Sequence, residues 1–109
     1  MAKKRVHVFD RSGDYVAEPP LMELTGAGGA ADTLRIMNNT DEDLVWVVTD
    51  ASLFQGGAFA EIVAARKFSS VKNPTNAANF SGFASYQMIG TRTGKKAKGN
   101  SDPVIIVEN

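Results

Sequence analysis

The chain has 109 residues, 43% of them hydrophobic and 22% charged, and its twelve basic and twelve acidic residues leave no net charge. These values are typical of a single globular domain over residues 1–109, and the neutral balance gives no overall field that would attract nucleic acid or an anionic membrane. The absence of cysteine excludes disulfides, thiol nucleophiles and cysteine-ligated zinc or copper.

The N-terminus does not have the pattern of a signal peptide. Residues Met1 to Arg5 carry the positive charge of such a segment, but charged residues follow where an apolar run is required. No run of about 18 apolar residues, the length that a membrane-spanning helix needs, occurs anywhere in the sequence. We therefore expect no membrane association and, by default, a cytoplasmic protein.

The N-terminal quarter predicts one clear strand. In residues 4–9, Val6 and Val8 alternate with polar side chains, which indicates a half-buried strand that ends at a turn-like run. Residues 15–20 are expected to form an extended connection, because their two prolines cannot donate backbone hydrogen bonds. Residues 26–31 match the glycine spacing of a dinucleotide-binding loop, but no helical pattern follows them, so we predict a simple loop.

The two apolar runs on either side of residues 38–43 predict the centre of the core. Leu34 and Ile36 alternate with polar residues in the first run. Leu44 and Trp46 fall on one side of the second run, which is rich in β-branched residues. The sequence therefore predicts a strand, a polar loop and a second strand.

Residues 59–68 fit both a helix and a strand. Several apolar residues of this range would share one face of a helix, and its alanines favour a helix intrinsically. The paired glycines before the range and the aromatic and β-branched residues at its end favour strands. We predict two strands joined by a turn at residues 65–67.

The last third of the sequence predicts two more strands, at residues 83–89 and 103–108, with a charged loop at residues 91–102 between them. The whole chain then has seven to eight short strands at even spacing, separated by turn residues. This pattern is typical of an all-β fold, and we predict an antiparallel β-sandwich.

The order of these segments resembles that of the cupredoxin-like and immunoglobulin-like sandwiches. LRIMNNTDEDLVWVV is similar to their unit of strand, asparagine-containing turn and strand, and FAEIVAARKFSSV, GFASYQMIG and PVIIVEN resemble the last strands of a cupredoxin. The resemblance implies a sandwich fold but no blue-copper activity, because a copper centre needs two histidines and a cysteine. The segment between Tyr86 and Val104 contains neither residue type. We expect no metal and no other cofactor.

The loop at residues 91–101 is the best local candidate for anion binding. Its basic residues, Arg92, Lys95, Lys96 and Lys98, stand among glycines that allow backbone amides to approach a ligand. A small anion or a nucleic acid could use such a loop, although no aromatic residues are interleaved with the charges. The sequence therefore offers this loop as an alternative site of function.

A group of acidic residues could in principle bind a hard cation such as calcium. Asp41, Glu42, Asp43 and Asp50 lie close together in the sequence, but their spacing lacks the glycine of an EF-hand loop. We expect these carboxylates to be solvated.

Three further residues are candidates for function. His7 is the only histidine, so a small hydrolase would have to pair it with a nearby carboxylate, and no nucleophile motif supports this. Phe80 and Phe83 flank a Ser-Gly pair and are candidates for an interface.

The sequence favours a non-catalytic binding or assembly module over an enzyme. The loops expected to carry binding are residues 38–43, 76–82 and 91–101. An open sheet edge could pair with a protein partner or with a second copy of the chain. The alternatives are anion or nucleic-acid binding through the basic loop, and a hydrolase that uses His7.

Overall fold

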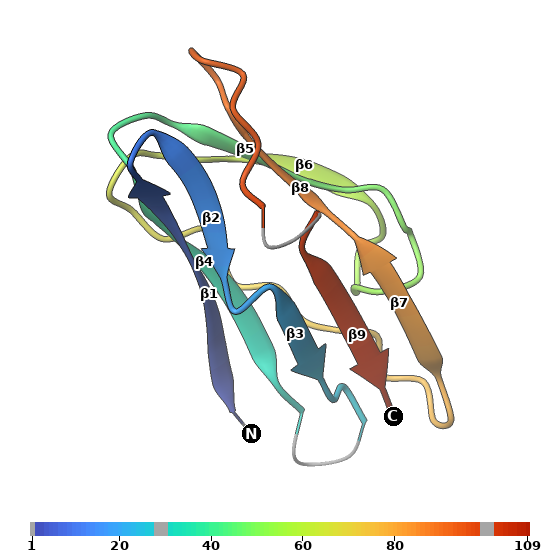
Figure 1. The fold of residues 1–109 in the computed structure, drawn as a ribbon. Coiled ribbons are helices and arrows are strands. Elements are labelled where there is room, and N and C mark those ends of the chain that lie inside the picture. Colours follow the sequence, from blue (N-terminus) through green and yellow to red (C-terminus); the bar gives the residue numbers. More distant parts are fainter. Residues whose placement is uncertain (1, 28–30, 99–101) are drawn as a thin grey trace.

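The computed structural model describes residues 2–27, 31–98 and 102–109, and these residues form strands and turns but no helix (Figure 1). The prediction of an all-β fold is confirmed for this part of the chain. The nine strands are β1 (Lys3–Arg11), β2 (Asp14–Glu18), β3 (Leu21–Leu24), β4 (Thr33–Asn39), β5 (Leu44–Val48), β6 (Phe59–Val63), β7 (Ser81–Ser85), β8 (Gln87–Gly90) and β9 (Val104–Glu108).

The strands form three sheets of three strands each, in the orders β2-β1-β4, β3-β9-β7 and β6-β5-β8. In Figure 1 the first two sheets lie side by side, and the third runs across their upper end. The pairs β1–β4 and β3–β9 are parallel, and the other four pairs are antiparallel. The expectation of purely antiparallel sheets is therefore wrong. β2 pairs with one edge of β1 in a hairpin, and β4 pairs with the opposite edge of β1 and runs parallel to it.

The expected number of strands, seven to eight, is also too low. Residues 15–20 were expected to be a connection, but most of them belong to β2. This strand forms a hairpin with β1, and the hairpin turns at Ser12 and Gly13. The single strand expected at residues 83–89 is divided at Tyr86. Before this residue the chain pairs with β9, and after it the chain pairs with β5.

The choice of strand over helix at residues 59–68 is confirmed for β6, and the turn follows at residues 65–66. The next residues, 67–72, run along the free edge of β4 through backbone hydrogen bonds, although they are not a regular strand. Leu34 and Lys72 exchange two such bonds, of 3.0 and 2.8 Å, and the Ser69 amide donates to the Ile36 carbonyl at 2.8 Å. This segment therefore extends the β2-β1-β4 sheet.

The hydrophobic core joins side chains from all three sheets. Trp46 is fully buried, as expected, and its ring makes edge-to-face contacts with the rings of Phe54, Phe59 and Tyr86 at centroid distances of 6.4, 4.9 and 6.3 Å. Such pairs stabilise a core beyond the effect of their buried area. Buried residues alternate with half-buried ones along β4, and Val6 and Val8 are the buried positions of β1, so this packing fixes which side chains reach the outer surface.

Candidate functional site

The second half of the predicted basic loop is held between two strands. Residues 95–98 follow β8 and lie between β8 and β2. On one side the Ala97 amide donates to the Met88 carbonyl at 2.9 Å, and on the other the Lys98 amide donates to the Tyr15 carbonyl at 3.0 Å. The buried Ala97 side chain points the opposite way from its exposed neighbours. The lysines are thus displayed by a backbone with regular hydrogen bonds on both sides.

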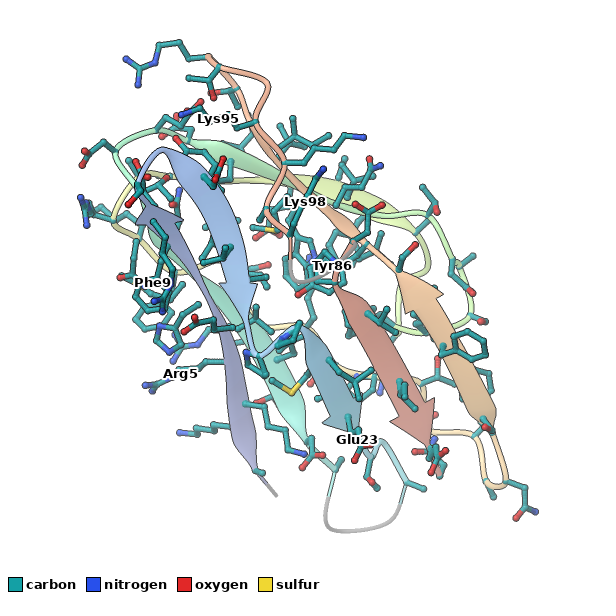
Figure 2. The ribbon with its side chains drawn as sticks, viewed as in Figure 1. Arg5, Phe9, Glu23, Tyr86, Lys95 and Lys98 are labelled. Carbon is teal, nitrogen blue, oxygen red and sulfur yellow. The ribbon has the colours of Figure 1, made fainter. Side chains whose placement is uncertain are left out.

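A groove of about 490 Å³ lies beside this segment. Lys95 Nζ is 5.3 Å from the centroid of the Tyr15 ring, which places one positive charge over an aromatic face. Figure 2 shows Lys95 and Lys98 on the chain that passes β2. The groove is lined by Gly13, Asp14, Tyr15, Val16, Lys95, Lys96 and Lys98.

The structure brings together three of the four basic residues that the sequence singled out. Lys95, Lys96 and Lys98 line the groove, whereas Arg92 does not. Tyr15 was missed, because residues 15–20 were read as a connection. The available signal was the apolar run from Tyr15 to Ala17 between the charged Asp14 and Glu18, with Tyr15 and Ala17 two residues apart and so on one face of a strand.

The backbone amides at the start of the loop bind a carboxylate of the chain itself. The Arg92 and Thr93 amides donate to Glu42 Oε1 at 3.0 and 3.1 Å, and the Thr93 hydroxyl donates to Glu42 Oε2 at 2.7 Å. The Tyr15 hydroxyl donates to the same Oε2 at 2.5 Å. A Cβ added at Gly90 would lie 2.4 Å from Oε1, so glycine leaves the space that the carboxylate occupies. The amides that were expected to approach an external anion are therefore already in use.

These donors stabilise the ionised form of Glu42. Hydrogen bonds from the hydroxyls of Tyr15 and Thr93, followed by those from the backbone amides, lower the pKa of Glu42 to about 2 against the opposing effect of burial. Burial, followed by the hydrogen bond to Glu42, raises the pKa of Tyr15. The carboxylate thus remains charged and ties the chain after β8 to β2.

The other three acidic residues of the predicted calcium-binding group each contact a different part of the chain. Asp41 pairs with Arg66 at 2.6 Å, Asp43 accepts the Ala65 amide at 2.9 Å, and Asp50 accepts the Ser52 amide at 2.8 Å. No group of three or more metal-ligating side chains occurs in the part of the chain that the structure describes. The expectation of freely solvated carboxylates holds only in part, because Glu42 is buried.

His7 lies on the outer face of the β2-β1-β4 sheet. Its ring stacks on that of Phe9 at a centroid distance of 5.8 Å, and its Nδ1 is 3.3 Å from Asn39 Nδ2. No hydrogen bond joins His7 to a carboxylate among the described residues. The arrangement gives no support to a hydrolase that uses this histidine.

The two candidate interface residues differ in exposure. Phe80 packs against the core, with its ring over the position where a Cβ of Gly82 would stand. Phe83 is 75% exposed and lies on β7, which pairs only with β9 among the described strands. Phe83 is therefore the more accessible of the two.

Comparison with models of known protein families gave no match, and comparison with curated proteins gave none either. The described residues contain no helix with the length and apolarity needed to cross a bilayer. The match of residues 26–31 to a dinucleotide loop includes residues 28–30, and the basic loop includes residues 99–101; both of these ranges lie outside the described residues.

Proposed function

We propose that the chain is a non-catalytic binding module and that the groove beside residues 95–98 binds a small anion that carries phosphate. The observation that carries this proposal is the convergence of three lysines on one groove. None of the three forms an ion pair with a described carboxylate. Asp14 also lines the groove, so its lining holds three positive charges and one negative charge.

Ammonium groups are the contacts that this groove offers an anion. The amides of residues 92 and 93 bind Glu42, and the Lys95 amide donates to the Thr93 hydroxyl at 3.3 Å. A Cβ at Gly13 would meet nothing within 4 Å, so the space beside this lining residue is open. Lysines act as mobile point charges on phosphate and require no fixed bidentate geometry.

Replacing two of the lysines tests the proposal. We expect K95A/K96A to weaken binding of pyrophosphate by about tenfold or more, because two charges that face the ligand are removed. Titrations followed by amide chemical shifts at low salt measure the affinity and locate the site. Raising the salt concentration should weaken binding by the wild type.

The matched control is K67A/R92A, which removes the same charge from exposed residues that do not line the groove. This variant should bind pyrophosphate nearly as well as the wild type. Equal losses in the two double variants, or amide shifts that occur away from residues 13–16 and 95–98, would overturn the proposal.

A second candidate function is self-assembly through the edge of β7. An edge strand with a large exposed apolar side chain such as Phe83 is a template for pairing with another chain. We expect light scattering to show a dimer for the wild type and a monomer for F83K, with the far-ultraviolet circular dichroism unchanged. A wild type that remains monomeric at every concentration would contradict this function.

We also propose that the three sheets form the two layers of a sandwich of the cupredoxin-like or immunoglobulin-like kind. The core supports this arrangement, because Val6 and Ile36 of one sheet share it with Leu44 and Trp46 of another. No copper centre accompanies the resemblance, since the segment between Tyr86 and Val104 contains neither histidine nor cysteine.

A further inference from the structure

The outer face of β1 carries both basic and aromatic side chains. Val6 and Val8 are fully buried, so the residues between and around them must point outward. Figure 2 shows Arg5 and Phe9 on the side of β1 away from β3 and β9. The outward residues of this strand are Lys3, Arg5, His7, Phe9 and Arg11.

Two arginines are paired directly across β1 and β4. Arg5 and Arg35 are Cα partners in the parallel register, and both guanidinium groups lie over the ring of Phe68, at 5.3 and 4.6 Å from its centroid. Phe68 belongs to the segment that extends the sheet, and it is 41% exposed. Two like charges are thus held side by side on one exposed aromatic ring.

Three of the cations at this end of the sheet have no counter-ion among the described residues. Within the described ranges, no carboxylate forms an ion pair with Lys3, Arg5 or Arg35. A hollow of about 230 Å³ opens beside them, and Lys3, Lys4, Arg5, Thr33, Arg35 and Val71 line it. Neighbouring cations without a partner repel each other, so an anion placed between them relieves the repulsion.

The carboxylates near this face form ion pairs with cations other than Lys3, Arg5 and Arg35. Glu18 of β2 is the register partner of His7, and its carboxylate pairs with Arg11 at 2.5 Å. Asp32 pairs with Lys4 at 3.4 Å. Lys3, Arg5 and Arg35 therefore remain available to phosphate.

We propose that this face binds a single-stranded nucleic acid. We call it the arginine face and define it by Lys3, Arg5, His7, Phe9, Arg35 and Phe68. Proteins that bind single strands combine a basic track for the phosphates with flat side chains on which bases stack. The stacked rings of His7 and Phe9 and the guanidiniums over Phe68 provide such flat surfaces.

The dimensions and the chemistry select this ligand over an acidic protein. From Lys3 to Arg11 the strand extends about 26 Å, which suits a site at the short end of the range of about 4–16 nucleotides. An acidic peptide would use the cations but would leave the aromatic rings without a planar partner. The arginine face shares no residue with the groove that is lined by Lys95, Lys96 and Lys98.

The test uses the full chain and a fluorescent oligothymidine of about 12 nucleotides, with anisotropy as the readout. We expect R5A/R35A to weaken binding by about tenfold or more and to reduce the dependence of affinity on salt. F68L keeps an apolar side chain but removes the ring, and it should weaken binding severalfold with little change in the salt dependence. Because these residues are exposed or half-buried, both variants should fold, and circular dichroism checks this.

Three comparisons make the result decisive. R66A/R92A removes two positive charges elsewhere and should bind nearly as the wild type does; a loss equal to that of R5A/R35A would overturn the proposal. An abasic oligomer of equal length should bind more weakly than oligothymidine, and equal binding would show a general polyanion surface instead. If K95A/K96A abolishes oligothymidine binding while R5A/R35A retains it, the nucleic acid uses the groove and the arginine face has no such role.

Discussion

Gly26→Ala is expected to lower the free energy of unfolding by about 3 kcal/mol, because the new methyl group has no space and adjacent hydrogen bonds are broken. A Cβ at this position would lie 2.1 Å from the Thr75 carbonyl oxygen and 2.9 Å from its carbonyl carbon. Both atoms belong to the backbone, so relief requires a shift of the chain. Asn109 ties these segments together, since its Oδ1 accepts the Gly26 amide and its Nδ2 donates to the Thr75 carbonyl, both at 2.6 Å.

Thermal unfolding followed by circular dichroism measures this effect, which corresponds to a fall in Tm of about 10 °C or more. Gly82→Ala is the matched control. Its Cβ would lie 2.8 Å from Phe80 Cζ, the end of a half-buried side chain that can rotate away. We expect the loss at Gly82 to be clearly smaller. Equal Tm values for Gly26→Ala and the wild type would show that residues 26 and 75 do not lie this close.

Glu42→Gln is expected to lower Tm by several degrees at neutral pH, because the amide lacks the charge that the four donors around Glu42 stabilise. The folded-state pKa, about 2, lies below the usual value of 4.5. The stabilisation is therefore fully present above 4.5 and is lost as the pH falls toward 2. The Tm difference between wild type and variant should shrink through this window.

Glu23→Gln is the control for this pH series, since Glu23 is exposed and its carboxylate makes no hydrogen bond within the described part of the chain. We expect Glu23→Gln to follow the wild type at every pH. A constant difference between Glu42→Gln and the wild type from neutral pH down to pH 2 would contradict the role given to the ionised carboxylate.

Period-two alternation was enough to locate most strands. Val6 and Val8, and Leu34 and Ile36, alternate because one face of each strand packs against the core, and this local requirement is visible in the sequence. The partner of each strand was not visible. Pairing in parallel, as β1 pairs with β4, and the change of partner at Tyr86 depend on residues far apart in the chain.

In the candidate sites, too, the sequence indicated features within one segment but not contacts between segments that are far apart in the chain. The charge of Lys95, Lys96 and Lys98 drew attention to their loop, and these residues line a groove. Glu42 accepts hydrogen bonds from the Arg92 and Thr93 amides, which are distant from it in the sequence. No local sequence pattern predicts that contact. The arginine face was missed because its residues come from three segments and only the fold makes them neighbours.

The carboxylate of Glu42 is an internal anionic ligand, because it belongs to the same chain as the amides that bind it. The Arg92 and Thr93 amides form an anion-binding loop, and the tether supplies their anion at a high effective concentration. Dissolved phosphate at ordinary concentrations competes poorly with such a ligand. The shape of this loop is therefore independent of the anions in solution, and any response to them belongs to the lysine side chains beyond it.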